Sequence, residues 1–125
     1  MNQQRKRVET LAHDLLYSYY VESDVEFLIS HFAPDVVWLG AGQNQKAEGR
    51  DHVASFFREG KEDLFPCIMS DEHYVIRQLG EEYWFCQGDS SVEAAPDSGK
   101  LLKGHQRITF ISVSYTHLDV YKRQR

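Results

Sequence analysis

The sequence lacks the features that mark several large classes of protein. Its 125 residues contain no apolar run near the roughly 20 residues that a membrane-spanning helix needs. The N-terminal stretch MNQQRKRVET lacks the apolar segment of a secretory signal peptide. Only two cysteines occur, Cys67 and Cys86, and two are too few for a disulfide framework. We therefore expect a cytoplasmic protein with reduced cysteines and no membrane partner.

Positive charge is scarce as well. The formal net charge of the chain is -5. The last fourteen positions carry three basic residues against one acidic residue, so that residues 1–111 carry a net charge of -7. An acidic chain repels phosphate backbones, and the short run Arg5, Lys6 and Arg7 forms no extended basic stripe. We therefore expect no nucleic acid partner.

Local motifs for catalysis or metal binding are also missing. The sequence contains no Gly-rich phosphate loop, no paired-cysteine zinc spacing, no nucleophile elbow and no His-x-x-x-His pair. Its histidines are scattered at positions 13, 31, 52, 73, 105 and 117. A metal site would require several of them to converge without a local motif. We therefore expect neither a metal ion nor another cofactor.

Helical patterns occupy the first half of the chain. The apolar positions of one helix face are Val8, Leu11, Ala12, Leu15 and Tyr19. Ser18 falls on the opposite, polar side of this helix. Ser23 and Glu26 have the spacing of a capping box, which predicts that a short second helix starts there. The stretch RDHVASFFREG, at residues 50–60, predicts a third helix that Gly60 ends.

Strand-forming residues dominate the second half. They cover residues 67–78, 82–93 and 101–112, and turn signals separate the three stretches, which predicts an antiparallel meander. A short strand in VVWLG and a loop or edge hairpin over GAGQNQKAEG come earlier. This order predicts an α+β fold in which helices cover one face of a curved sheet. The side chains expected to be buried between the two layers are Leu11, Leu15, Phe32, Phe56 and Phe57.

One long stretch carries a family resemblance. The segment ESDVEFLISHFAPDVVWLGAGQNQKAEGRDHVASFF resembles the front half of the SnoaL-like, or nuclear transport factor two-like, superfamily. The resemblance covers about residues 8 to 111. It implies a cone-shaped fold with three N-terminal helices packed on a strongly curved antiparallel sheet. It does not settle the function, because this superfamily includes isomerases, dehydratases, transport adaptors and sensory modules.

The end of the chain departs from this superfamily. Its members usually end in one more strand, but here the chain continues into VSYTHLDVYKRQ. This string resembles a C-terminal sequence that recurs on unrelated reading frames of metagenomic origin. We therefore interpret residues 1–112 as a SnoaL-like domain and residues 113–125 as a non-native tail on a fragment, with the last strand missing or replaced. The alternation of Ile111, Val113 and Tyr115 also fits a longer strand.

A cone of this kind implies an apolar cavity between helices and sheet. The candidate cavity residues are Tyr17, Tyr20, Trp38, Tyr83 and Gln87. Strand alternation places Tyr83 and Gln87 on one face of the second long strand, opposite Trp84 and Cys86. The same aromatic side chains could equally pack in the core or in a dimer interface. On the third long strand, His105 and Arg107 fall on the face that we expect to be solvated.

The ketosteroid-isomerase branch of the superfamily gives a sharper test of catalysis. It uses a carboxylate base at the end of the first strand and a phenol on the first helix. An ungapped alignment on HFAPDVV places Gly40 at the position of the base and Leu16 at that of the phenol. Glycine cannot accept a proton and leucine cannot donate a hydrogen bond. We therefore predict no catalytic residue.

Three functions remain open at this point. The first is a small-molecule-binding, non-catalytic sensor or regulatory module of a larger bacterial signalling protein, a homodimer whose ligand is small and apolar or aromatic. The second is a stand-alone SnoaL-like enzyme, an isomerase, dehydratase or hydrolase, with its acid or base on the missing strand. The third is a dimerisation or association domain that uses the outer face of the sheet.

Overall fold

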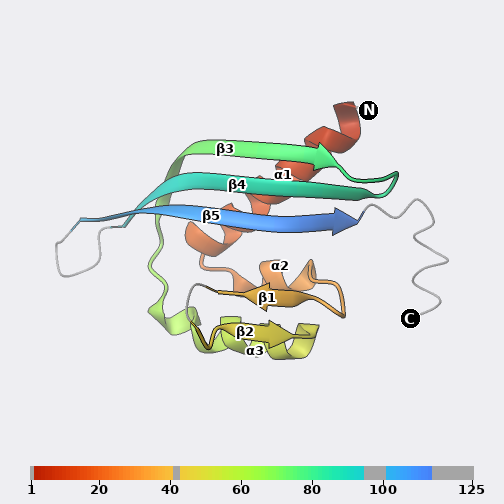
Figure 1. The fold of residues 1–125 in the computed structure, drawn as a ribbon. Helices are drawn as coiled ribbons and strands as arrows, with labels where there is room; N and C mark the ends of the chain where they lie inside the picture. Colours follow the sequence, from red (N-terminus) through yellow and green to blue (C-terminus); the bar gives the residue numbers. More distant parts are fainter. Residues whose placement is uncertain (1, 41–42, 95–100, 114–125) are drawn as a thin grey trace.

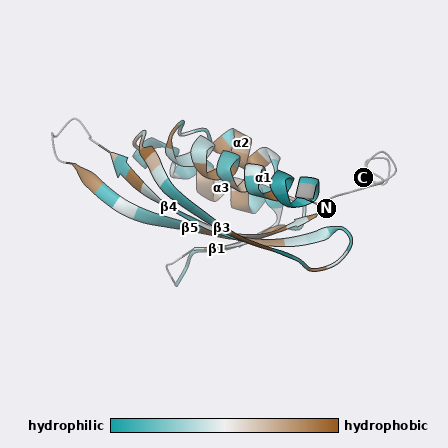
Figure 2. Cartoon of the chain, turned by 90° about the horizontal axis from the view of Figure 1, so that it is seen from above, coloured by the Kyte–Doolittle hydropathy of each residue, from teal (hydrophilic) through white to brown (hydrophobic). Residues whose placement is uncertain are grey.

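The helices lie together on one side of the strands. The computed structural model describes residues 2–40, 43–94 and 101–113. Its helices are α1 (Asn2–Tyr20), α2 (Val25–Ser30), α3 (Arg50–Glu59) and the short 3-10 helix η1 (Lys61–Asp63). Figure 1 shows α1 crossing behind the long strands, and the view from above in Figure 2 shows all three α-helices on one side of them. The predicted α+β arrangement of three helices on an antiparallel sheet is confirmed.

The strands form two antiparallel sheets. The long strands β3 (Ile68–Gln78), β4 (Tyr83–Ala94) and β5 (Leu102–Val113) pair in the order β3-β4-β5. Each lies within one residue of its predicted bounds, because stretches of strand-forming residues separated by turn signals mark a strand clearly. The register of β3 shifts between Ser70 and His73, and the added twist of such an irregularity bends a sheet. The short strands β1 (Val37–Leu39) and β2 (Lys46–Glu48) form the edge hairpin that the sequence allowed.

Helix α2 begins differently from its prediction. Asp24, not Ser23, is the N-cap, and its carboxylate accepts a hydrogen bond of 3.1 Å from the backbone N–H of Phe27. Ser23 instead adopts a positive φ of 54° in the turn before the helix. Ser18 was also misplaced by the sequence pattern, because it is buried and its hydroxyl donates to the carbonyl of Leu15 at 3.1 Å. That bond satisfies the hydroxyl within the helix, so Ser18 can face the interior.

The core forms where α1 meets the sheet. The alternating side chains Trp84, Cys86 and Ser90 of β4 are buried on the face towards the helices. Ile76 of β3 and Ala12 of α1 complete this contact. Arg5 of α1 also donates to the backbone carbonyl of Ile76, at 3.1 Å. Both cysteines are free thiols, as predicted, with Cys86 buried and Cys67 partly buried.

A second apolar cluster joins α2 to α3. Val25, Ile29 and Ala54 are buried there. Of the side chains expected in the core, Leu15 is buried, whereas Leu11, Phe32, Phe56 and Phe57 are only partly buried, which corrects their prediction. Phe56 and Phe57 pack against Trp38 with ring centroids 5.4 Å apart in both pairs. Trp38 lies on the three-residue strand β1, which is too short to cover them fully.

The far end of the sheet bears on the interpretation of the tail. Val113 is the last residue of β5 and pairs with Tyr83, so β5 runs one residue into the segment interpreted as foreign. The rest of that segment, residues 114–125, lies outside the described residues. Within the described part of the chain, β5 has β4 as its only strand neighbour, and the β1–β2 hairpin is a separate sheet. No helix in residues 2–40, 43–94 or 101–113 is long and apolar enough to cross a membrane.

Two isoleucines on opposite faces of the sheet test which face is buried. Ile76 is 1% exposed and Ile111 is 61% exposed. Ile76→Ala should lower the free energy of unfolding by about 2 to 5 kcal/mol, because it leaves a cavity against α1. The control Ile111→Ala should cost about 1 kcal/mol or less, because it loses only strand propensity and a solvent-exposed cross-strand contact with Phe85. Urea unfolding measures both changes, and equal losses would contradict the assignment of the faces.

Candidate functional site

A cavity of about 370 Å³ lies between α1 and β3. The side chains that line it are Glu9, Thr10, His13, Glu72 and Tyr74. Residues four apart on a helix share a face, which brings Glu9 and His13 together. Alternate residues on a strand share a face, which aligns Glu72 with Tyr74. The cavity therefore joins one face of α1 to the helix-facing side of the strand β3.

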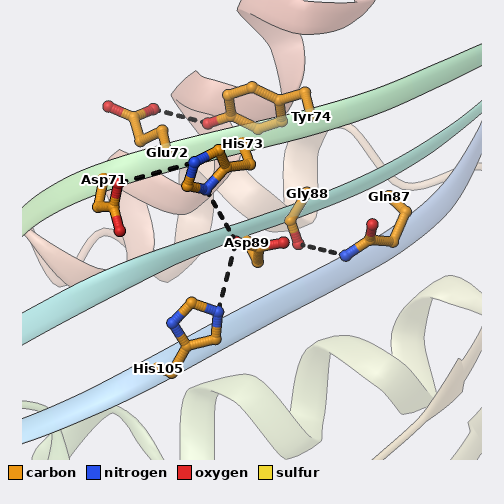
Figure 3. A network of polar contacts seen from close by, with 8 residues as sticks. All are labelled: Asp71, Glu72, His73, Tyr74, Gln87, Gly88, Asp89 and His105. Carbon is orange, nitrogen blue, oxygen red and sulfur yellow. Dashed lines mark hydrogen bonds and ion pairs between the residues drawn. The ribbon is translucent and has the colours of Figure 1, made fainter.

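Three of these side chains form a hydrogen-bonded network. The hydroxyl of Tyr74 donates to Oε1 of Glu72 at 2.6 Å, and Nδ1 of His13 lies 2.6 Å from the same oxygen. Figure 3 shows Glu72 and Tyr74 side by side on β3. The ring of His13 also stacks on Tyr17, with centroids 5.5 Å apart and planes 29° apart. The imidazole is thus held by a carboxylate at one nitrogen and by an aromatic ring on one face.

The network fixes the charge of its members. Burial acts to raise the pKa of Glu72, but the hydrogen bonds from His13 and Tyr74 outweigh it and lower that pKa below the ordinary 4.5. Burial, followed by the bond to Glu72, raises the pKa of Tyr74 above its ordinary 10.0. Near neutral pH the site therefore presents a carboxylate and a protonated phenol. A histidine oriented by a carboxylate is an arrangement that can bind a polar group or accept a proton.

Two of the predicted cavity residues lie elsewhere, between α1, β1 and α3. The hydroxyl of Tyr20 donates to Oε1 of Gln106 at 2.5 Å. Burial, followed by the neighbouring Tyr19 and Cys67, raises the pKa of Tyr20 to about 12, so the phenol remains a donor. The rings of Tyr20 and Tyr19 meet edge to face at 4.8 Å, and Tyr19 meets Phe57 at 5.6 Å. Because Phe57 also contacts Trp38, this chain of rings links Tyr20 with Trp38.

The other three predicted residues do not join them. Tyr17 is 41% exposed and contacts His13 beside the 370 Å³ cavity. Tyr83 is 51% exposed and lies with Gln87 on the face of β4 away from the helices. The amide of Gln87 donates there to the carbonyl of Gly88 at 3.3 Å. The five predicted residues therefore fall in three places and do not line one cavity.

Sequence reasoning missed the residues that do line the cavity. His13 and Glu72 are far apart along the chain and belong to no motif, so no local signal joins them. The period of two along β3 groups Glu72 with Tyr74, and the period of α1 groups Glu9 with His13. The pairing of those two faces depends on how α1 crosses the sheet. That crossing is a tertiary feature, which the sequence pattern does not specify.

The outer face of the sheet carries a separate polar cluster, drawn in Figure 3. Oδ1 of Asp89 lies 3.4 Å from Nδ1 of His73 and 3.3 Å from Nε2 of His105. Both histidines are exposed, as expected for His105 from the sequence. In the part of the chain that the structure describes, no group of three or more His, Cys, Asp or Glu side chains could hold a metal ion.

Neither position matched to the isomerase catalytic pair can supply a base or an oxyanion donor. Leu16 is buried in the apolar interior. A Cβ added at Gly40 would come within 2.5 Å of the amide oxygen of Gln45 and 2.9 Å of the Trp38 ring, so a larger residue there requires a shift of its neighbours. The backbone N–H of Gly40 donates to the carbonyl of Gln45 at 2.7 Å, closing the hairpin. Gly40 therefore helps to close the β1–β2 hairpin, and it has no side chain that could act as a base.

Comparison with solved structures identifies the fold. A ketosteroid isomerase-like protein from Erwinia carotovora atroseptica is 19% identical, with a TM-score of 0.65 over 89% of this chain and 84% of that one. The chain has the nuclear transport factor two-like fold. No protein-family model matches the sequence, and no curated protein matches it.

Two further structures show how widely this fold is used. A protein from Catenulispora acidiphila in complex with S-DNPA is 14% identical, with a TM-score of 0.67 over 93% of this chain and 85% of that one. A protein from Xanthomonas campestris, assigned to the association domains of calcium/calmodulin dependent protein kinase II, is 16% identical. Its TM-score is 0.67 over 88% of this chain and 76% of its own. At these identities the likeness shows the fold and not the function.

The Tyr20–Gln106 contact can be tested with a matched pair of tyrosines. Tyr20→Phe should lower the free energy of unfolding by about 1 kcal/mol, because the Gln106 oxygen loses its donor in a partly buried setting. Tyr17→Phe on the same helix is the control and should change stability by less than about 0.5 kcal/mol, because Tyr17 is exposed. Thermal or urea unfolding measures both, and an equal effect would show that the hydrogen bond contributes nothing.

The Glu72 network should make stability depend on pH. Because the pKa of Glu72 is lower in the folded protein than its ordinary 4.5, ionised Glu72 stabilises the fold above that pH. This contribution is lost as the pH falls through the lowered pKa. Urea unfolding from neutral pH down to about pH 3 should therefore show a shallower loss of stability for Glu72→Gln than for the unchanged protein. His13→Ala, which removes one of the two partners of Glu72, should give an intermediate slope, and identical slopes for all three proteins would contradict the network.

Proposed function

We propose that this chain is a small-molecule-binding domain whose ligand occupies the cavity between α1 and β3. The observation that carries the proposal is the cavity of about 370 Å³ lined by side chains that hold one another in place. Small-molecule sites typically have volumes of about 300 to 1,000 Å³ and a few fixed polar groups that orient the ligand. Glu72, His13 and Tyr74 are such groups, because their hydrogen bonds fix them before any ligand arrives.

The ligand that fits this site combines a polar group with an aromatic or apolar body. The Glu72 carboxylate and the His13 imidazole offer hydrogen bonds to the polar group. The rings of Tyr74 and of Tyr17, which stacks on His13, offer flat apolar surface to the body. The complex of a Catenulispora acidiphila neighbour with S-DNPA supports small-molecule binding by this fold.

Binding without conversion is the form of the proposal that we favour. Gly40 and Leu16 leave the isomerase positions without a base or an oxyanion donor. A domain that binds a ligand without converting it can serve as the sensor or regulatory part of a larger bacterial signalling protein, and this is the role we assign to it. A homodimer fits that role, because the outer face of the sheet exposes the apolar side chains of Val75, Tyr83 and Ile111, and Ile111 is the register partner of Phe85.

An enzyme is the second candidate, and one observation favours it. Glu72 lies 2.6 Å from Nδ1 of His13, which is how a carboxylate orients a histidine that acts as a general base. In that case the other ring nitrogen, Nε2, would take a proton from a substrate held in the same cavity. The two candidates share a site and differ only in whether the bound molecule is changed.

The test is a fragment titration followed by amide NMR. A library of small aromatic molecules that carry one polar group should contain members that shift the signals of His13 and Tyr74 in a saturable way. Glu72→Gln should weaken that binding about tenfold or more, since a hydrogen bond to a charged group is lost. Glu93→Gln is the matched control, because Glu93 lies on the outer face of β4 and pairs with Lys103 at 3.7 Å.

The outcomes separate the candidates. Fragments that bind and are recovered unchanged support the sensor role. Conversion of a bound fragment that stops in His13→Gln would replace it with the enzyme role. Failure of every fragment to shift these two residues, or equal binding by the Glu72→Gln and Glu93→Gln variants, would overturn the proposed site.

A further inference from the structure

The charge of the cavity beside His13 narrows the class of ligand that it can take. Among the described residues that line it, Glu9 and Glu72 are carboxylates and none is a lysine or an arginine. Burial opposes the ionisation of Glu72, but its hydrogen bonds lower its pKa, so it is ionised near neutral pH. Two carboxylates face one histidine, so even a protonated His13 would leave the wall with a net negative charge.

The hydrogen-bonding groups of the wall agree with this charge. The hydroxyl of Tyr74 donates to Oε1 of Glu72, and Nδ1 of His13 lies 2.6 Å from the same oxygen. An ionised carboxylate only accepts, so Nδ1 of His13 is the donor, and Nε2 of the neutral ring is then an acceptor. Both donors of the network are thus already engaged, and the groups left for a ligand are mainly acceptors.

The second carboxylate oxygen of Glu72 is the central acceptor. Both bonds of the network fall on Oε1, and Oε2 has no partner among the described residues. The buried polar side-chain atoms that lack a partner in that part of the chain belong to Ser23, Trp84 and Ser90, so Oε2 keeps accessible surface. The Glu72 side chain as a whole is 27% exposed. A ligand in the cavity can therefore donate to Oε2 while the network on Oε1 stays intact.

Glu9 adds a second negative charge at the rim of the cavity. It is exposed and lies one helical turn before His13 on α1. Burial and the bond to Glu72 are the main causes that raise the pKa of Tyr74, and the charge of Glu9 adds to them. The electric field of Glu9 thus reaches the phenol in the wall, as does that of Glu72.

A positively charged donor is the group that these features recognise. In the described part of the chain no group of three or more His, Cys, Asp or Glu side chains could hold a metal ion, which leaves an organic cation. A protonated primary amine carries a positive charge and three N–H donors. We propose that the cavity selects a small primary ammonium with an aromatic or apolar body, whose N–H groups donate to Oε2 of Glu72 and Nε2 of His13. This inference rests on the function proposed above and names the class of its ligand.

Three probes that share one body and differ in charge test the inference. At neutral pH phenethylamine is a cation, phenethyl alcohol is neutral and phenylacetate is an anion. Phenethylamine should shift the amide NMR signals of His13 and Tyr74 saturably. It should bind at least about tenfold more tightly than the alcohol, because a hydrogen bond between charged groups is the stronger one. Phenylacetate should bind most weakly, because the two carboxylates of the wall repel it.

The acidic residues of the chain provide matched variants. Glu9→Gln should weaken phenethylamine about threefold, because an exposed ion pair contributes little. Asp14→Asn removes the same charge from an exposed position of α1 outside the described lining, and should change the affinity much less than twofold. Glu72→Gln should reduce the preference for the amine over the alcohol from about tenfold to about twofold or less. That ratio reports on charge, because a merely loosened fold would weaken both probes alike.

A second cavity serves as an internal reference. It has a volume of about 140 Å³ and lies between α1 and the ends of β4 and β5. Its described lining contains Arg7 and no carboxylate, and it shares no described residue with the cavity beside His13. Phenethylamine should therefore leave the amide signals of Trp84 and Ser112, which line this second cavity, unchanged.

The possible failures of this inference and of the proposed function can be told apart. Equal or tighter binding of phenethyl alcohol or phenylacetate at His13 and Tyr74 would overturn the inference and leave the binding function standing. Phenethylamine that does not move these two signals would also overturn it, whatever other fragments bind there. Equal weakening by Glu9→Gln and Asp14→Asn would reduce the preference to general attraction by an acidic chain. Failure of all three probes and of the whole fragment library would overturn the proposed function as well.

Discussion

The packing of α1 across the sheet is the contact on which the rest of the molecule depends. Ala12, which has no exposed surface, and Val8 pack against Ile76 and Cys86. A small side chain at this point lets the helix approach the strands closely, and apolar burial of this kind is the main favourable term in folding. One cavity opens between α1 and β3, and the other opens between α1 and the paired ends of β4 and β5. Residues of α1 line both cavities. The side chains in each cavity therefore depend on which face of α1 packs against which strand.

The positions of the helices and strands along the chain could largely be predicted, because helix and strand periods and turn residues are local features of the sequence. Successive side chains of a strand point to opposite faces, and this rule alone separates Trp84 and Cys86 of β4, which are buried, from Tyr83 and Gln87, which point outward. Errors arose where tertiary packing overrides pattern. Ser18 is polar yet buried, because its hydroxyl finds an acceptor within its own helix. The aromatic side chains of α3 are less buried than their pattern predicts, because only a short hairpin strand covers them.

The site was much less predictable than the fold. The sequence correctly separated the two faces of β4, but it could not say which face meets the helices, and so Tyr83 and Gln87 were placed among the cavity residues. His13 and Glu72 come together through the angle at which α1 crosses β3, and no motif encodes that angle. The absence of a base at Gly40 could be predicted, because a missing side chain needs no tertiary context. Composition and alternation therefore predict which residues form the helices and the strands. The candidate site depends instead on side chains that come into contact only because α1 packs across the sheet at a particular angle.

The exposed edge of β3 has a consequence for the solubility of the protein. Unpaired strand edges recruit other strands and so seed aggregates. Here the carbonyl of Ile76 already accepts from two guanidinium groups, Arg5 at 3.1 Å and Arg77 at 3.0 Å. Further along the strand, Asp71 has a positive φ of 56° at the register shift, which interrupts the ladder that an incoming strand would need. Two cations and one register shift thus make β3 a poor template, so that this edge disfavours the edge-to-edge growth that leads to fibres.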